Sequence, residues 1–310
     1  MTEKTSELLT RVKQLYARLQ ANSLTDADVV PLSEVELPDY SETIRGFYND
    51  RPTFEAALGY FIPTFDVFSV FRDPKQLVLD VGAHFGYSAI AMRYHGCQAK
   101  IVSIDAIPSN LACLSAIKAL EGDSYDYIHR AVGGTSGVLR MFMPVMNGVG
   151  ITAIASTGAT LCERYAFLLA DTATHYKPRT DSGVDEVHIL KLEIESASLD
   201  EIFEARGDEA ERIVAIKMDL EGHEGPAIKG SERIFRRTKP LLMIENANKD
   251  PMVVEAMFDY GYFHCERHQG VLKPHAEISF ANDGFWIHPS RVEEYRSLGI
   301  FEGAAPASSS

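Results

Sequence analysis

The stretch from Leu77 to Gly86, LVLDVGAHFG, constrains the fold of this chain more than any other. Its first half crowds valine and leucine onto a short run, which is typical of a strand buried on both faces of a parallel sheet. Gly82 and Gly86 then let the backbone turn sharply and approach a ligand where a Cβ atom would collide. A helical segment follows, and the free N–H groups of its first turn attract a ligand. The stretch therefore predicts a nucleotide-type pocket at the carboxyl end of a strand.

The spacing of the two glycines indicates which ligand this pocket takes. A dinucleotide-binding turn reads G-x-G-x-x-G, whereas this turn places Ala83, His84 and Phe85 between its glycines. A bulky Phe85 directly before the helix leaves less room for a pyrophosphate. We therefore expect a ligand without phosphate groups, such as S-adenosylmethionine, whose methionine end needs a site for a carboxylate and an ammonium group.

The amino-acid composition argues against two classes of partner, nucleic acids and membranes. The 310 residues include 44 acidic and 30 basic side chains, a net charge of −14, which argues against binding to a nucleic-acid backbone. No apolar run approaches the roughly 20 residues that a membrane span needs, and the N-terminal segment lacks the apolar core of a signal peptide. The four cysteines are widely spaced and form no C-x-x-C pair, which indicates free thiols. We expect a cytoplasmic protein with neither nucleic acid nor membrane as a partner.

A second apolar run ends in an acid. The segment KIVSID closes with Asp105, which follows Gly82 by 23 residues. In nucleotide-binding βαβ units an acid about 20 residues after the turn bonds the ribose hydroxyls. A surface acid at a strand end is the alternative, and the glycine turn before it favours the ligand role.

A third stretch, IVAIKMDLEGHE from Ile213 to Glu224, predicts another buried strand. It ends in Asp219, with Glu221 and His223 just beyond. The later strand LLMIE ends in Glu245. Because the carboxyl ends of parallel strands form the ligand-binding edge of an open sheet, these four side chains are expected at that edge.

The remaining segments give less specific evidence about the fold and the site. Residues 1–22 carry an amphipathic stripe that packs either on the body of the domain or on a second subunit, as in a homodimer. Residues 23–76 are rich in aromatic side chains, which fill a core or else line an acceptor pocket. Residues 138–145 alternate as in a β-extension. Residues 147–183 depart from the α/β rhythm, and a connection of this length predicts a lid.

Four motifs together resemble the FkbM family of S-adenosylmethionine-dependent methyltransferases. They are DVGAHFG at 80–86, SIDAIPSN at 103–110, KMDLEGHE at 217–224 and KPLLMIE at 239–245. The resemblance implies a doubly wound, Rossmann-like class I methyltransferase fold, α/β, with a seven-stranded, mostly parallel sheet whose last strand is antiparallel. It also implies O-methylation of a sugar or natural-product hydroxyl. The chain departs from the family pattern in having His84 for Asn, Asp105 for the commoner Glu, and Leu220 for Val.

The resemblance covers residues 77–290 and not the first 70-odd residues, whose organisation is inferred from the sequence pattern. Residues 1–76 form an N-terminal helical extension or cap, and residues 77–290 form the methyltransferase domain, with 147–183 as its lid. Residues 291–310 form a C-terminal helix and a disordered tail.

Two sets of residues are expected to form the site. The cofactor set comprises Asp80, Gly82, His84, Gly86, Asp105 and Ala131. The acceptor, a small molecule with a hydroxyl group, is expected to meet Asp219, Glu221 and Glu245. The catalytic set comprises His223, Asp219 and Glu221. His223 is a candidate base because its ordinary pKa, about 6.5, lies nearest to the working pH, whereas an ion pair with neighbouring carboxylates is the alternative role.

Three alternatives stay open. Asp219, Glu221, His223 and Glu245 are also a ligand set that suits a divalent metal ion, although a metal-free site is favoured. The second alternative is an NAD(P)-dependent oxidoreductase on a similar fold. The third is a non-catalytic, cofactor-binding pathway protein. The sequence does not identify the acceptor, and amine acceptors fit the strand-end carboxylates as well.

Overall fold

A computed structural model describes most of the chain: residues 3–59, 62–152, 155–157, 186–245, 250–275 and 283–304. The chain divides into two compact units. The larger unit comprises residues 39–137, 195–220 and 224–310, and the smaller one residues 1–38, 138–194 and 221–223. This division differs from the domain bounds inferred from the sequence, which stay a prediction. Most of the expected lid and the end of the tail lie outside the described residues.

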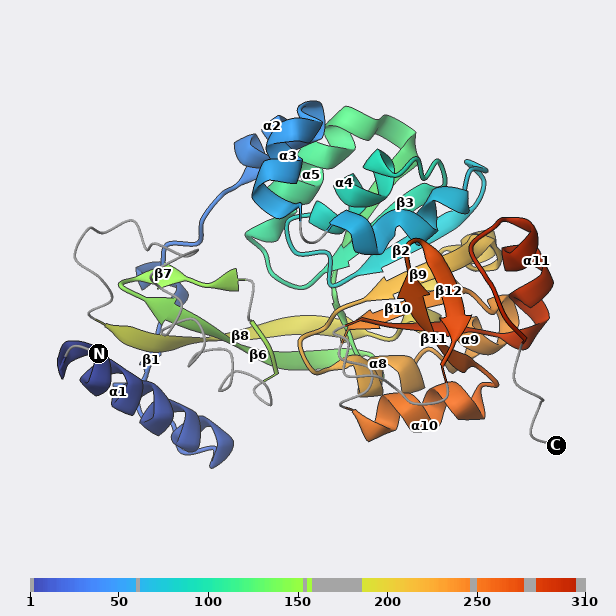
Figure 1. The fold of residues 1–310 in the computed structure, drawn as a ribbon. Coiled ribbons are helices and arrows are strands. Elements are labelled where there is room, and N and C mark those ends of the chain that lie inside the picture. Colours follow the sequence, from blue (N-terminus) through green and yellow to red (C-terminus); the bar gives the residue numbers. More distant parts are fainter. Residues whose placement is uncertain are drawn as a thin grey trace. The chain divides into compact units, whose positions relative to one another are not determined.

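An eight-stranded sheet forms the centre of the larger unit (Figure 1). Its strand order is β12-β11-β13-β10-β9-β2-β3-β4. The strands are β2 (Leu77–Val81), β3 (Lys100–Asp105), β4 (Tyr125–His129), β9 (Ile213–Met218), β10 (Leu241–Glu245), β11 (Phe263–His268), β12 (Val271–Pro274) and β13 (Asp283–Ile287). The run from β10 to β4 pairs in parallel, whereas β13 is antiparallel to both β10 and β11. The predicted mostly parallel α/β sheet is confirmed, and β12 adds an eighth strand through an antiparallel hairpin with β11.

Both faces of this sheet are buried. Successive residues of the central strands point to opposite sides, and helices cover the side chains on each side. Val78 packs in one apolar cluster and Leu77 and Leu79 in the other. The helices that supply the first cluster are α2 (Ser41–Asn49), α3 (Arg51–Leu58), α4 (Tyr87–Tyr94), α5 (Asn110–Glu121) and α11 (Val292–Ser297). The second cluster is supplied by α7 (Leu199–Glu204), α8 (Glu224–Lys229), α9 (Glu232–Thr238) and α10 (Pro251–Asp259). Figure 1 shows α2 to α5 on one face and α8 and α10 on the other, so the sheet is doubly wound.

The aromatic residues of the expected cap fill the core. Phe54, Phe65, Phe68 and Phe71 are all essentially inaccessible to solvent, and they join the cluster under α4 and α5. Phe65, Phe68 and their neighbours belong to a long 3₁₀ segment, Ile62–Val70, which leads directly into the approach to β2. The packing role, rather than a pocket lining, is therefore observed for these four side chains.

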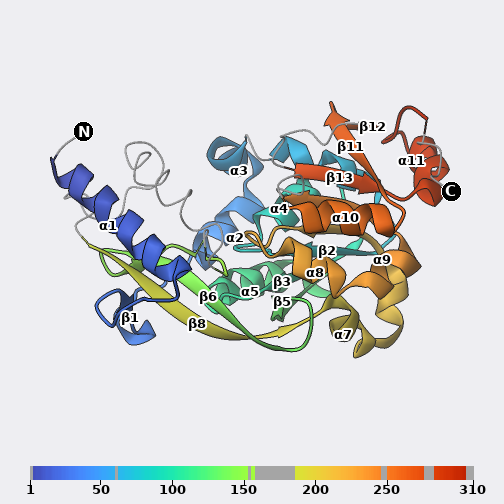
Figure 2. The same cartoon turned by 90° about the horizontal axis from the view of Figure 1, so that it is seen from below.

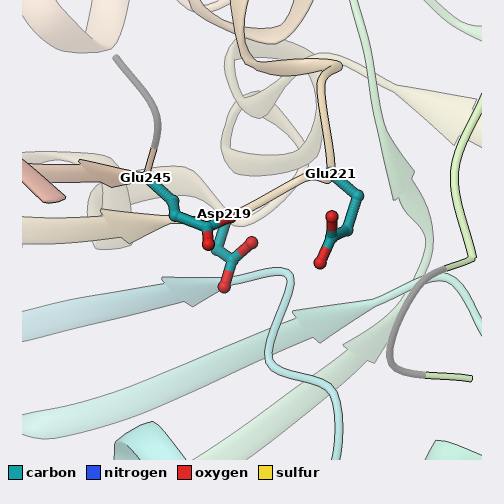
Figure 3. A group of neighbouring side chains, drawn as sticks. All are labelled: Asp219, Glu221 and Glu245. Atoms are coloured by element: carbon teal, nitrogen blue, oxygen red, sulfur yellow. The ribbon is translucent and has the colours of Figure 1, made fainter. Parts of the chain in front are cut away.

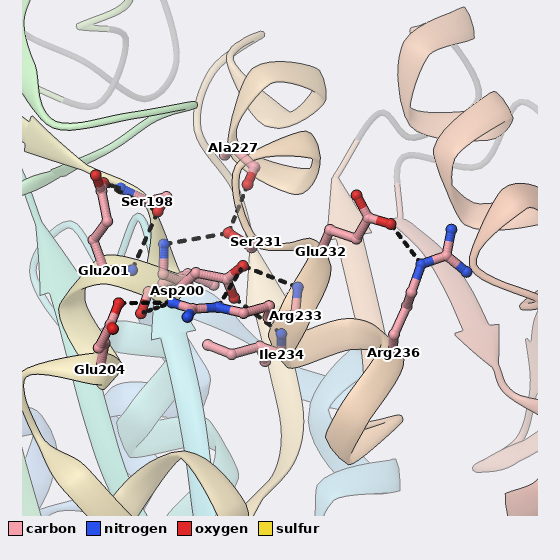
Figure 4. Close-up of polar contacts among 11 residues, drawn as sticks. Ser198, Asp200, Glu201, Glu204, Ala227, Ser231, Glu232, Arg233, Ile234 and Arg236 are labelled. Carbon is pink, nitrogen blue, oxygen red and sulfur yellow. Dashed lines mark hydrogen bonds and ion pairs between the residues drawn. The ribbon is translucent and has the colours of Figure 1, made fainter.

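Two polar side chains link the helices that follow β8 (Figure 4). The carboxylate of Asp200 accepts hydrogen bonds from the backbone N–H groups of Arg233 and Ile234, both over 2.9 Å, at the start of α9. Ser231 Oγ donates to the Ala227 carbonyl oxygen over 2.6 Å and accepts a bond from the N–H of Leu199. These contacts satisfy N–H groups that a helix terminus leaves without partners, and they join α7 to α9.

A second sheet, with the order β1-β8-β6-β7, lies mainly in the smaller unit. Its strands are β1 (Val29–Val30), β6 (Gly137–Met146), β7 (Val149–Gly150) and β8 (Val187–Ala197), and β5 (Ala131–Val132) pairs with the end of β8. The expected β-extension corresponds to β6. The structure thus contains a second, five-stranded sheet, which the sequence pattern did not predict as a sheet of its own.

Helix α1 (Glu3–Gln20) runs along this second sheet (Figure 2). Its residues Val12, Leu15 and Leu19 are buried against Met146 and the start of β8. This part of the amphipathic stripe therefore packs within the chain, the first of the two predicted alternatives, while a homodimer stays a prediction. No helix among the described residues is long and apolar enough to cross a membrane.

Candidate functional site

The turn after β2 has three residues in the left-handed region: Gly82 at φ 73°, His84 at φ 51° and Gly86 at φ 82°. A Cβ atom on Gly82 would stand 1.7 Å from the carbonyl oxygen of Asp219. A Cβ atom on Gly86 would stand 2.3 Å from the Ile117 side chain of α5. The glycines therefore give room to neighbouring parts of the protein itself, which the sequence pattern did not indicate.

Asp105 holds this turn against the end of β3. Its Oδ2 accepts a hydrogen bond from the N–H of His84 over 2.8 Å. Its Oδ1 accepts bonds from the N–H of Ile107 over 2.8 Å and from Asn110 Nδ2 over 2.9 Å. Burial raises the pKa of Asp105 to about 6, although these three bonds oppose the rise. A carboxylate has about four lone-pair sites, so Asp105 can accept about one further bond.

Asp80 lies beneath the turn and is inaccessible to solvent. Ser88 Oγ donates to its Oδ2 over 2.6 Å, and Ser103 Oγ donates to the same oxygen over 3.3 Å. The other carboxylate oxygen faces the ammonium of Lys217 at 3.6 Å. Asp80 therefore contacts protein groups, and any effect on a ligand passes through the turn above it.

Lys217 is the centre of the polar contacts between β2 and β9. Its Nζ donates to the Gly82 carbonyl oxygen over 3.0 Å and lies 3.4 Å from Asp219 Oδ2. Although burial lowers the pKa of this lysine, the carboxylates of Asp219, Asp80 and Glu245 hold it above its usual range. Lys217 was not among the site residues expected from the sequence, although it begins the third motif and precedes Asp219 by two residues.

Asp219 and Glu245 stand at the ends of the adjacent strands β9 and β10 (Figure 3). Each offers a carboxylate oxygen within 4.8 Å of the other. Glu221 follows on the turn after β9 at φ 52°, and His223 comes two residues later. Burial lowers the pKa of His223, so its imidazole is neutral at neutral pH. Glu221 and His223 belong to the short segment that groups with the smaller unit.

His84 is a neutral imidazole in the turn. Burial lowers its pKa to about 3; nearby Lys217 also lowers it, and Asp219 opposes the change. A neutral imidazole offers both a donor and an acceptor nitrogen, and the asparagine amide of the family pattern likewise offers a donor group and an acceptor oxygen. The ring lies against Phe85, with the two ring centroids 3.7 Å apart.

Phe85 itself is buried in the core against Tyr40, with ring centroids 4.7 Å apart. Contrary to the expectation from the sequence, the bulk of Phe85 does not restrict the space for a pyrophosphate, because the ring packs among core side chains. Ala131 is also buried, in β5, and the preceding residue Arg130 donates its N–H to the Asp105 carbonyl oxygen over 3.0 Å.

Charge is concentrated at one edge of the main sheet. The strands β3, β2, β9 and β10 are consecutive neighbours, and each has a carboxylate at its last residue or one position away from it: Asp105, Asp80, Asp219 and Glu245. Lys217 is the cation that contacts this group. A site of this composition favours a ligand with positive charge over a polyanion.

The comparison with known families agrees with this architecture. The model of the methyltransferase FkbM domain matches residues 80–273, more than half of the chain. The protein therefore belongs to the class of S-adenosylmethionine-dependent methyltransferases. The chain belongs to the FkbM methyltransferase family. This finding favours a methyltransferase over the oxidoreductase that the sequence left open.

Solved structures give weaker likenesses. Methyltransferase FkbM from Methylobacillus flagellatus is 14% identical with a TM-score of 0.39, and the match covers 81% of this chain and 61% of that one. A precorrin-6y C5,15-methyltransferase from Geobacter metallireducens is 10% identical with a TM-score of 0.36, covering 74% and 86%. An O-methyltransferase from Bacillus cereus in complex with SAH is 13% identical with a TM-score of 0.29, covering 93% and 90%. No curated protein sequence matches the chain.

Proposed function

We propose that this methyltransferase transfers the methyl group of S-adenosylmethionine to a hydroxyl group of a small molecule, such as a sugar or another natural product. The observation that carries the proposal is the row of carboxylates at or next to the ends of β3, β2, β9 and β10, whose negative charge the Lys217 ammonium offsets in part. The sulfonium and ammonium groups of the cofactor suit such an edge, whereas the pyrophosphate of a dinucleotide would add negative charge to it.

The cofactor would lie over the turn Gly82–Gly86. Asp105 would accept one hydroxyl of the ribose, because three of its lone-pair sites already serve the protein. A second acceptor is then needed for the other hydroxyl. Burial keeps His84 neutral, so this side chain would add no repulsion to the binding of a cation.

The reaction itself needs alignment and a proton acceptor. The hydroxyl oxygen attacks the methyl carbon in line with the carbon–sulfur bond, which breaks to leave a neutral thioether, and the hydroxyl proton passes to a base. We assign His223 as that base, with Asp219 and Glu221 as alternatives. Burial rather than a carboxylate shifts its pKa, so the imidazole is available in its neutral form. Asp219 and Glu245 would orient the acceptor.

A metal-assisted reaction is the less favoured variant. Asp219 and Glu245 are hard oxygen donors of the type that binds Mg²⁺. However, the Lys217 ammonium lies 3.4 Å from Asp219 and already supplies the positive charge that an ion would bring. The donor set therefore fits a metal ion poorly, and no step of the proposed reaction uses one.

The cysteines support a reducing compartment. Cys97, Cys113 and Cys265 are free and buried, as expected of a protein that works in the cytoplasm.

Isothermal titration calorimetry tests the proposal directly. S-adenosylmethionine should bind to the purified protein, NADH should not, and Asp105→Ala should weaken the binding at least tenfold. Once binding is established, transfer of a labelled methyl group to a panel of hydroxyl and amine compounds identifies the acceptor. A preference for NADH, or methylation of amines alone, would contradict the proposed reaction.

A further inference from the structure

Lys217 is a buried cation in the middle of the main sheet. Its side chain is 7% exposed, and lysine is almost never buried unless it is paired. In the pairing of β2 with β9 it stands directly opposite Asp80. Its three neighbours are the Gly82 carbonyl oxygen, Asp80 Oδ1 and Asp219 Oδ2, at 3.0, 3.6 and 3.4 Å. The ammonium donates a hydrogen bond to the Gly82 carbonyl oxygen, whereas its contact with Asp80 Oδ1 at 3.6 Å is an ion pair without a hydrogen bond.

These three oxygen atoms belong to parts of the site that have different proposed roles. The Gly82 carbonyl is part of the turn that would carry the cofactor, and the Asp219 carboxylate faces the side where the acceptor is expected. Asp80 lies beneath both and is inaccessible to solvent. Without the ammonium, the buried Asp80 carboxylate and the partly exposed Asp219 carboxylate would lose the positive charge that contacts both of them, and like charges near each other repel.

We propose that Lys217 is the positioning residue of this site, which holds the glycine turn and the Asp219 carboxylate in a fixed relation to each other. Its ammonium also offsets part of the negative charge of the pocket. The effect on the cofactor depends on the proposed function, whereas the link between turn and carboxylate does not.

Hydrogen exchange tests the link without any ligand. The N–H groups of Gly82 and Ala83 both donate to the Ile104 carbonyl oxygen, so their exchange reports on the turn. In Lys217→Met, which keeps the length but removes the ammonium, exchange in the segment 82–86 should rise at least tenfold. Lys100→Met is the matched control, because Lys100 also lies on the sheet and pairs with Glu209 at 3.4 Å. Unchanged exchange in Lys217→Met would overturn the proposal.

A second measurement distinguishes the loss of the Lys217 charge from a general loosening of the glycine turn. S-adenosylhomocysteine, the neutral thioether product, is the probe beside S-adenosylmethionine, and both affinities are measured by calorimetry. Loosening alone weakens the two equally. Loss of a positive charge from the pocket favours the sulfonium, so the ratio of the two dissociation constants should shift toward S-adenosylmethionine by about threefold or more. The ratio should not change in Lys100→Met.

The outcomes are distinguishable. Faster exchange together with a shifted ratio supports the proposal, and an unshifted ratio would overturn its electrostatic part. If the wild-type protein binds neither compound, the proposed function fails, while the exchange result still decides the role of Lys217. Should Lys217→Met not fold, Lys217→Gln, which keeps a donor without the charge, carries the ratio measurement.

Discussion

The backbones of Gly82 and Asp219 are in direct contact. A Cβ atom at residue 82 would stand 1.7 Å from the Asp219 carbonyl oxygen, and the Asp219 N–H donates to the carbonyl oxygen of Val81 over 3.0 Å. The turn after β2 and the end of β9 are thus packed backbone against backbone. The glycine is required for this contact as well as for any ligand above it.

Gly82→Ala should destabilise the protein strongly. The new Cβ meets a backbone atom that cannot move aside, so overpacking adds roughly 1–3 kcal/mol to the roughly 1–2 kcal/mol of the left-handed conformation. Gly96→Ala is the control, since Gly96 is left-handed at φ 95° but has no described atom within 4 Å of the Cβ position. Urea unfolding measures both. Equal losses in the two variants would show that the contact with Asp219 costs nothing.

Asp105 should make stability depend on pH. Its pKa of about 6 in the folded state exceeds the ordinary 3.8, so the folded state binds more protons between these values. Its contribution to the free energy of unfolding therefore falls by about 3 kcal/mol as the pH rises from 3.8 to 6, and is constant above. In Asp105→Asn this fall is absent. The melting temperature of the variant relative to wild type should rise between pH 4.5 and 6.5; a constant difference would contradict the raised pKa.

Asp200 should matter more for stability than the exposed ion pairs beside it. Replacing it with alanine removes the acceptor of two N–H bonds at the start of α9, a loss of about 1–2 kcal/mol by analogy with helix caps. Glu232→Ala, which breaks an exposed pair with Arg236 at 2.6 Å, should cause no measurable change in melting temperature. Similar effects of the two variants would show that Asp200 is not an effective cap.

The variant Leu15→Ala tests whether α1 packs within the chain or against a second subunit. Because its side chain is 3% exposed against β6 and β8, Leu15→Ala should cost about 2–5 kcal/mol without changing the molecular mass in solution. Lys13→Ala, on the exposed side of the same helix, is the control. Thermal unfolding and sedimentation equilibrium give the two readouts. A wild-type dimer that Leu15→Ala dissociates would instead assign the stripe to a subunit interface.

Removal of metal ions should have no effect. Lys217 already supplies the positive charge next to Asp219, so treatment with EDTA should leave S-adenosylmethionine affinity and methyl transfer unchanged. The measurements are calorimetry and labelled methyl transfer before and after dialysis. Loss of activity that one divalent ion restores would favour the metal-assisted reaction.

The local sequence pattern was sufficient to predict the central strands of the main sheet. The bounds of β3 and β10, Lys100–Asp105 and Leu241–Glu245, agree with the apolar runs that end in acids. Short runs of this kind have few alternatives in a sheet covered on both faces, and parallel strands bring their carboxyl ends to one edge. The expected row of acids followed from these two rules.

Other features depend on residues far apart in the chain. Lys217 acquires its role from Asp80 and Gly82, which belong to β2 and the turn after it. The remaining hydrogen-bonding capacity of Asp105 depends on two donors from its own motif, Ile107 and Asn110, and on the His84 N–H from the turn after β2. Likewise, β6 and β8 form a sheet across a long connection. The sequence by itself determined the central strands, the glycine turn and the acids that end them, because these follow from local periodicity and residue type. Only the tertiary structure decided which of these groups are buried, charged and already bonded, because desolvation and close contact arise from the whole surroundings of an atom.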